Sequence, residues 1–292
     1  MLILAKSKLN DCAFDKIRKN AEAIELHLED EIINDANWWN QELIDALPIK
    51  IVHAPLLKKD DIRLESVEHR KILLSTCKFA QRIAECKGYD IIVVIHLGMN
   101  PQIMKEVGIY DEVKTFMNIL LGTYPNLEFA IENVIRLNKT IDGQSLTFRS
   151  VDFTAAPTFA KDINNKRVGT CLDTCHAMMD TVLMGLVANH IGDEYKRFKV
   201  EEVERGLDAF FEANRGVVKL IHLAKINKHG CGDDHGLYFS DDDEQLMREI
   251  IGLYRKYQYI CPITIEVKED DYYDAKNFQQ TRKVLLKVLS EN

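Results

Sequence analysis

Histidines and carboxylates follow the apolar segments of this chain with a regularity that predicts a metal centre. Six strand-like runs end in such a residue: IVHAP, IIVVIHLG, LEFAIENV, VGTCLDTCH, VVKLIHLAK and CPITIEV. An ionisable side chain is unfavourable at the end of a buried strand unless it has a partner. We therefore expect the six strand ends to converge on a metal, with these ligands: His53, His96, Glu132, Asp173, His222 and Glu266.

The ligand types narrow the choice of metal. Imidazole nitrogen combined with carboxylate oxygen suits zinc, manganese or iron, whereas magnesium and calcium prefer oxygen ligands. His176 lies three residues after Asp173 and can reach a second ion across a first helical turn. Asp233 and His235 in GDDHG can bind one ion from the same side of an extended segment. One zinc takes three or four protein ligands, so this set fits three ions better than one.

The segments that must position these residues alternate between strands and helices. A helix is expected from about 65 to 86, where Leu73, Cys77, Ala80 and Ala84 share one face before Gly88. Further helices are expected near 110–121, 152–165, 198–213, 241–257 and 274–290. Strands that are continuous Val, Ile and Leu runs are typical of parallel sheets. The pattern predicts one (β/α)₈ barrel over residues 1–292, with the active site at the carboxyl ends of the strands.

Several other segments have simpler interpretations. Leu137–Ser150 and Thr181–Tyr195 are expected to be long functional loops at the active-site end. His27 has no matched partner in the pattern, and we interpret it as structural. We expect Cys171 and Cys175 to pack in the core, and the two tryptophans to cover the side of the barrel. The acidic run Asp241–Glu244 is typical of a helix start.

Composition limits the class of protein. The chain of 292 residues is 46% hydrophobic, enough for a large core, and has no apolar run of membrane-spanning length. Its seven scattered cysteines fit a reduced cytoplasmic protein, and we expect a monomer with no membrane partner. The net charge of −8 disfavours binding nucleic acid over a broad face, although a local basic rim remains compatible with it.

At these residues the chain resembles the endonuclease IV family of zinc-dependent apurinic/apyrimidinic endonucleases, within the xylose-isomerase-like barrels. GTCLDTCHA is the most specific match. The family's strand-three histidine resembles His53, and its His-x-Gly turn resembles His96-Leu97-Gly98. Its Glu-Asn pair resembles Glu132-Asn133, and its late Asp-x-His resembles Asp233-Asp234-His235. Its last-strand glutamate resembles Glu266. The resemblance runs from about residue 50 to 267.

This resemblance implies three zinc ions and a hydrolytic mechanism. One ion would take His53, His96 and a bridging Glu132. A second would share Glu132 and add Asp173, His222 and Glu266, and a third would take His176, Asp233 and His235. A hydroxide between the metals would attack phosphorus in line. Basic side chains in nearby loops would stabilise the phosphate: Lys58, Lys59, Arg136, Lys139, Lys225 and Lys228.

The sequence also differs from this family in one segment, and it is compatible with a second enzyme class. The segment IELHLEDEIINDAN is acidic where family members carry an aromatic and basic segment that engages distorted DNA. This difference argues against duplex DNA and leaves another phosphodiester as the alternative substrate. A sugar isomerase or epimerase would need one Mn²⁺, Co²⁺ or Mg²⁺ ion, held by Glu132, Asp173, His222 and Glu266, with the two glutamates as acid and base. A non-catalytic barrel that binds a ligand or partner is the third alternative.

Overall fold

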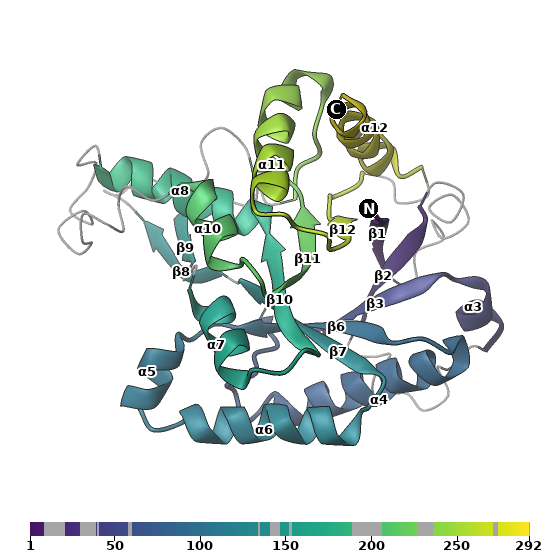
Figure 1. Ribbon diagram of the computed structural model, residues 1–292, viewed down its shortest axis with the longest axis vertical. Helices are drawn as coiled ribbons and strands as arrows, with labels where there is room; N and C mark the ends of the chain where they lie inside the picture. The colour runs from purple at the N-terminus through teal and green to yellow at the C-terminus, as the bar shows by residue number, and fades with distance from the viewer. Residues whose placement is uncertain are drawn as a thin grey trace.

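Eight parallel strands form a closed barrel in the computed structural model of the chain (Figure 1). In chain order they are β1 (Ile3–Lys8), β2 (Ala23–His27), β3 (Ile49–His53), β6 (Ile91–Leu97), β7 (Leu127–Asn133), β10 (Val168–Asp173), β11 (Val218–Leu223) and β12 (Ile263–Ile265). Each strand pairs with the next one in this order, and β12 closes the ring by pairing with Ile3, Leu4 and Ala5 of β1. The predicted (β/α)₈ barrel is confirmed.

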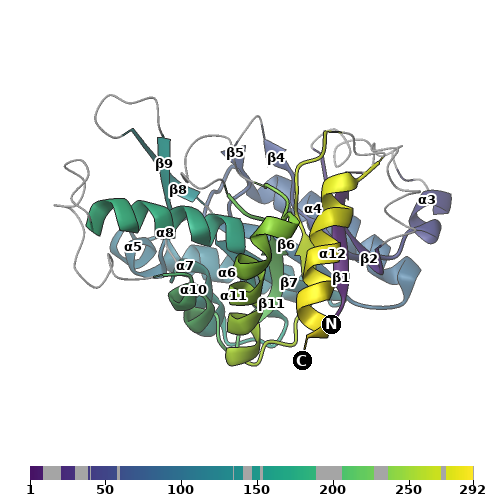
Figure 2. The same cartoon turned by 90° about the horizontal axis from the view of Figure 1, so that it is seen from above.

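Helices surround the barrel between these strands (Figures 1 and 2). The structure describes residues 1–8, 21–29, 39, 41–57, 60–133, 135–140, 147–151, 154–188, 206–226, 236–270 and 274–291. Its α-helices include α3 (Gln41–Ala46), α4 (Arg70–Lys87), α5 (Pro101–Glu106), α6 (Tyr110–Thr123), α7 (Ala155–Ile163), α8 (Thr174–Ala188), α10 (Leu207–Ala213), α11 (Glu244–Lys256) and α12 (Lys276–Ser290). Within these ranges, no helix has the length and apolar character needed to cross a bilayer.

Helix α4 shows how the sequence pattern builds this outer layer. Its predicted apolar stripe is buried and faces the barrel: Leu73, Cys77, Ala80 and Ala84. Gly88 ends the helix with φ of 70°, a backbone region that glycine adopts without strain. The helix begins at Arg70, whereas the sequence pattern predicted a start near Glu65. The reason is that the preceding segment pairs with the barrel, where the Leu64 amide donates to the His96 carbonyl (2.9 Å).

The two predicted functional loops are partly regular structure. Most of Leu137–Ser150 belongs to an antiparallel hairpin of β8 (Ile135–Thr140) and β9 (Thr147–Val151). Helix α8 continues to Ala188, so a loop from Thr181 is wrong for its first half, and residues 189–195 lie outside the described residues. A second small hairpin joins β4 (Leu56–Leu57) to β5 (Asp60–Asp61). Figure 2 shows both hairpins on one side of the barrel, opposite the two chain ends.

Two predicted structural features are confirmed. The acidic run forms a short 3₁₀ segment, η2 (Asp241–Asp243), that leads directly into α11, and Ser240 and Asp243 cap it reciprocally. Trp39 packs edge-on against Phe79, with ring centroids 5.5 Å apart, and the Arg82 guanidinium lies over its face. These contacts place Trp39 against α4 on the side of the barrel, whereas Trp38 lies outside the described residues.

The interior of the barrel is filled by one layer of apolar side chains from seven strands: Leu4, Ala23, Ile51, Val94, Ala130, Cys171 and Leu220. The eighth strand, β12, carries the buried Thr264. Side chains alternate between the two faces of a strand, so the residue two positions later also points into the barrel, closer to its carboxyl end. This second inward layer forms the floor of the candidate site.

Candidate metal centre

Each of the eight strand positions in this second layer carries an ionisable side chain. In chain order they are Lys6, Glu25, His53, His96, Glu132, Asp173, His222 and Glu266. Six of them are the residues predicted from the strand ends, and they are brought together as expected. Glu25 and His222 have no exposed surface, and Glu132 is 3% exposed. A buried layer of this kind requires internal charge compensation.

Glu132 lies at the centre of the layer. Its Oε2 atom lies 3.2 Å from His53 Nε2, 3.4 Å from His96 Nε2 and 3.4 Å from His222 Nδ1. Burial opposes ionisation of this carboxyl, but the charge and hydrogen bonding of His222, with hydrogen bonds from His53 and His96, hold its pKa well below the usual range. Glu132 is therefore ionised, and one of its carboxylate oxygens faces three imidazoles.

A second group of ligand atoms lies around His222. Its Nδ1 atom is 2.7 Å from Glu266 Oε2 and 4.0 Å from Asp173 Oδ2. Burial, together with the charges of Glu132 and Glu266, raises the pKa of Asp173 to about 6, although His176 and His222 oppose this shift. Burial also opposes ionisation of Glu266, but Lys6 and His222 hold its pKa well below the usual range. The two carboxylates therefore differ in how readily they take a proton.

His176 adjoins both groups from the first turn of α8. Its backbone amide donates to Asp173 Oδ1 (2.8 Å), and this bond satisfies one of the free amides at the start of the helix. Its Nδ1 lies 3.5 Å from both Glu132 Oε1 and Asp173 Oδ2. Asn133 joins β7 to β10 beside it by bonding the amide and carbonyl of Asp173. The predicted reach of His176 across a helical turn thus agrees with the geometry.

Sequence reasoning missed Lys6 and Glu25. The Lys6 ammonium donates to Glu266 Oε1 (2.6 Å) and lies 3.7 Å from Glu25 Oε1. Glu25 Oε2 lies 3.0 Å from His222 Nε2, and His222 and Lys6 lower the pKa of Glu25 although burial opposes them. The signal was present in the sequence. Glu25 lies between Ile24 and Leu26 in a buried strand, where a charge requires a partner.

The donor set fits divalent metal ions. His53 Nδ1 lies 2.7 Å from the Ala54 carbonyl, and His176 Nδ1 lies 2.8 Å from the Asn133 carbonyl. A carbonyl accepts only from a protonated nitrogen, so with a metal bound these contacts would keep the proton on Nδ1 and direct the Nε2 lone pair of each ring to the ion. Ligand atoms about 2.0 Å from a tetrahedral zinc ion lie about 3.3 Å from one another. The contacts from Glu132 Oε2 to His53, His96 and His222 are 3.2–3.4 Å. Suitable groups also include Glu132, Asp173 and His176, and Asp173, His222 and Glu266.

The remaining predicted residues are less closely defined. Asp233, His235 and Lys228 lie outside the described residues, as does the side chain of Arg136 on β8. Lys225 pairs with the Asp243 carboxylate, which already compensates its charge. With Met178, Leu237 and Leu246, Lys225 lines a separate cavity of about 660 Å³ between α8, α10 and α11.

Four neighbouring residues complete the surroundings: His27, Cys171, Cys175 and Arg63. His27, interpreted as structural and without a partner, in fact stacks on His53 with ring centroids 4.9 Å apart. Cys171 is part of the apolar layer, as predicted, and Cys175 is also buried. Arg63 pairs with His96 through the backbone. Its guanidinium packs against Gly98, where a Cβ atom would lie only 2.6 Å from Arg63 Nη1. Glycine at this position thus gives an arginine space beside the His96 strand end.

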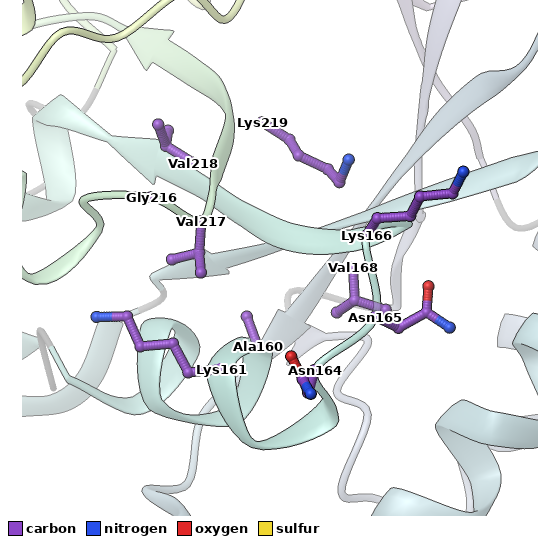
Figure 3. A pocket seen from close by; sticks show the side chains of 10 residues that line it. All are labelled: Ala160, Lys161, Asn164, Asn165, Lys166, Val168, Gly216, Val217, Val218 and Lys219. Atoms are coloured by element: carbon purple, nitrogen blue, oxygen red, sulfur yellow. The ribbon is translucent and has the colours of Figure 1, made fainter.

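A cavity of about 650 Å³ lies at the other end of the barrel. Figure 3 shows it at the amino ends of β10 and β11, with Lys166 and Lys219 extending in one direction and Lys161 in another. Lys219 already pairs with Glu128, and Lys161 donates to the Ala213 carbonyl. None of the candidate metal ligands lines this cavity.

Zinc binding should release a proton from His222 near neutral pH. Burial opposes a charge on this imidazole, but the carboxylates of Glu25, Glu266 and Glu132 raise its pKa well above 6.5. A coordinating nitrogen must lose its proton, so zinc affinity should rise with pH, by up to about tenfold per unit, as long as the metal-free imidazole is protonated. Calorimetric titration with zinc in buffers of different ionisation enthalpy measures this release. Affinity that does not change with pH, and no proton release, would contradict the assignment of His222.

Comparison with solved structures finds the same fold in proteins of different activity. A D-tagatose 3-epimerase-like protein is 19% identical, with TM-score 0.63, and the match covers 100% of this chain and 99% of that chain. Endonuclease IV from Thermus thermophilus is 16% identical, with TM-score 0.61, over 98% of this chain and 100% of that one. A third structure, of a Thermus thermophilus protein soaked with ZnCl₂, is 15% identical, with TM-score 0.60, over 100% and 99%. No protein-family model and no curated protein matches the sequence. At these identities the comparisons establish the fold alone.

Proposed function

We propose that the protein is a zinc-dependent phosphodiester hydrolase similar to endonuclease IV, which cleaves DNA at abasic sites or a related phosphodiester. The observation that carries this proposal is the position of His53 and His96. Both present Nε2 to the same Glu132 oxygen, on the side of the site provided by β3 and β6. A mononuclear centre formed by Glu132, Asp173, His222 and Glu266 does not need either histidine.

The charge of the buried layer also favours more than one ion. Glu25, Glu132, Asp173 and Glu266 contribute four carboxylates, and Lys6 contributes one ammonium, so neutral imidazoles leave three net negative charges. One divalent cation would leave the layer negative, whereas two would make it slightly positive. A slightly positive floor suits a substrate that carries a phosphodiester anion.

The residues have separate tasks in such a site. Glu132 would be shared between ions, with His53 and His96 on one side and Asp173, His222 and Glu266 on the other. Bound zinc lowers the pKa of coordinated water to near neutrality and polarises phosphoryl oxygens. His176 and, from the sequence resemblance, Asp233 and His235 would hold the third ion. Arg63 is the described basic side chain beside the His96 strand end, where it can contact an anionic substrate.

Lys6 bears on the choice between the two enzyme classes. An epimerase of this fold would use Glu132 and Glu266 to move protons on either face of a sugar. Glu266 Oε1 accepts a hydrogen bond from the Lys6 ammonium, and Oε2 faces His222 Nδ1 at 2.7 Å. A carboxylate held between two nitrogens in this way is a good ligand and a weak base.

Sugar epimerisation is the second candidate, and one observation favours it. Glu132, Asp173, His222 and Glu266 by themselves provide a complete four-ligand set at the barrel floor. The structural similarity to the D-tagatose 3-epimerase-like protein is as good as the similarity to endonuclease IV. A mononuclear manganese, cobalt or magnesium site would then act on a sugar or a sugar phosphate.

Metal content measured together with activity tests the proposal. Protein purified without chelator or metal-affinity tag should contain about two to three zinc ions per chain by elemental mass spectrometry. It should cleave DNA that contains an abasic site, lose this activity after chelation, and regain it with zinc. One bound ion, ketose epimerisation and no cleavage of any phosphodiester would contradict the proposal and support the alternative.

A further inference from the structure

Lys6 and Glu25 lie in the same inward layer as the metal ligands, on β1 and β2, the first two strands of the barrel. Glu25 has no exposed surface, and its Oε2 lies 3.0 Å from Nε2 of His222. Glu25 and His222 are 197 positions apart in the sequence, and β1 and β12 lie between their strands, β2 and β11, in the ring. Nothing in the pattern of strand-end ligands accounts for a carboxylate at this position.

The two nitrogens of His222 have different surroundings. Nδ1 faces three ligand oxygens, at 2.7 Å from Glu266, 3.4 Å from Glu132 and 4.0 Å from Asp173. Nε2 faces Glu25. When a metal takes the place of one imidazole proton, one nitrogen keeps its proton and the other offers a lone pair. The hydrogen bond from Nε2 to Glu25 keeps the remaining proton on Nε2, so the lone pair is on Nδ1, toward the ligand oxygens.

We propose that Glu25 is a positioning residue for the metal centre. It fixes the His222 tautomer and ring orientation and makes Nδ1 a stronger metal ligand. His53 and His176 place their second nitrogen against backbone carbonyls, whereas His222 uses a carboxylate. A carboxylate behind a ligating histidine raises the basicity of the ligand more than a neutral carbonyl does. The ion held by Asp173, His222 and Glu266 is therefore the one that the centre binds with the highest affinity.

Lys6 completes this support. Its ammonium lies between Glu266 Oε1 and Glu25 Oε1, at 2.6 and 3.7 Å. It compensates part of the charge of both carboxylates and leaves Glu25 Oε2 for His222. The group Glu25, His53 and His222 is compact enough to hold a cation itself. A metal there would have to displace the Nε2 proton and would compete with Lys6, so we assign Glu25 to support and not to ligation.

Metal affinity measured with the metal alone tests this inference. Glu25→Gln keeps a hydrogen-bond acceptor but removes the charge, and Glu25→Leu removes both. The tightest zinc site, measured by competition with a chromophoric chelator, should weaken about tenfold to a hundredfold in the Gln variant and more in the Leu variant. The visible spectrum of the cobalt-loaded protein should change in both variants, because the imidazole is no longer held in place.

Glu29 provides the matched control. It lies four residues after Glu25 and pairs with Lys8 of β1 at 2.9 Å, but this pair is partly exposed to solvent. Glu29→Gln and Glu29→Leu should bind zinc as the unchanged protein does. If folded Glu25→Gln binds zinc and cobalt with unchanged affinity and spectrum, the positioning role is wrong. This inference relies on the metal centre of the proposed function and not on the reaction, so failure to cleave abasic DNA leaves its test unaffected.

Discussion

Replacement of Glu132 by glutamine should remove most of the bound zinc and lower the rate of phosphodiester cleavage about a thousandfold. The reason is that His53, His96 and His222 all face one Glu132 oxygen, at 3.2–3.4 Å. A neutral amide oxygen is a weaker ligand for all ions that share it. Metal-ion stabilisation contributes several kcal/mol to a transition state, and about 4 kcal/mol corresponds to a thousandfold in rate. Metal content and the rate on abasic-site DNA measure the two effects.

Glu128→Gln is the control for this substitution. Glu128 lies on the same strand, β7, four residues earlier, and pairs with Lys219 at the amino end of the barrel. This variant should keep its zinc and its rate. A folded Glu132→Gln variant with full metal content would show that Glu132 is not a shared ligand.

Lys6→Met should destabilise the metal-free protein by about 3 kcal/mol or more, because removal of one partner leaves a buried charge uncompensated. Without the ammonium, the four carboxylates of the layer have no internal cation apart from protonated histidine. Bound zinc supplies positive charge in its place, so the loss should be smaller in the zinc-loaded protein. Urea unfolding with chelator and with zinc gives the two free energies.

Lys8→Met provides the comparison. Lys8 lies on the same strand as Lys6 and pairs with Glu29, and its side chain is 49% exposed, so its loss should change stability by less than about 1 kcal/mol. Equal destabilisation of the metal-free and zinc-loaded Lys6→Met protein would mean that Lys6 does not compensate the ligand charges. That result would also weaken the argument from charge for more than one ion.

The barrel and most of the site follow from the sequence because both depend on strand periodicity. His53, His96 and Glu132 each end a long apolar run, and alternation directs them into the barrel two positions after a buried residue. The same rule applies to Leu4 followed by Lys6 and Ala23 followed by Glu25. Glu25 lies at the start of the acidic segment IELHLEDEIINDAN, whose many carboxylates obscure this alternation. A charge between Ile24 and Leu26 was the available signal.

The errors in the predicted loops have a physical explanation as well. The segment Leu137–Ser150 is polar and contains Asp142-Gly143, the dipeptide most typical of a tight hairpin, between β-prone flanks. The expectation of a loop rested on the place of this segment after a strand at the active-site end, where the chain in fact forms β8 and β9. The second expected loop, from Thr181, begins inside α8: the Thr181 hydroxyl donates to the Ala177 carbonyl one turn earlier, and the helix continues to Ala188.

The short last strand makes completion of the site depend on the two ends of the chain. β12 has three residues, pairs with β1, and is followed directly by Glu266. The Lys6–Glu266 ion pair consequently joins positions that are 260 residues apart. During synthesis from the amino end, the first seven strands emerge with their ligands while the ring is still open. The Asp173, His222 and Glu266 group is therefore complete only when the barrel closes, so tight metal binding would report a closed barrel.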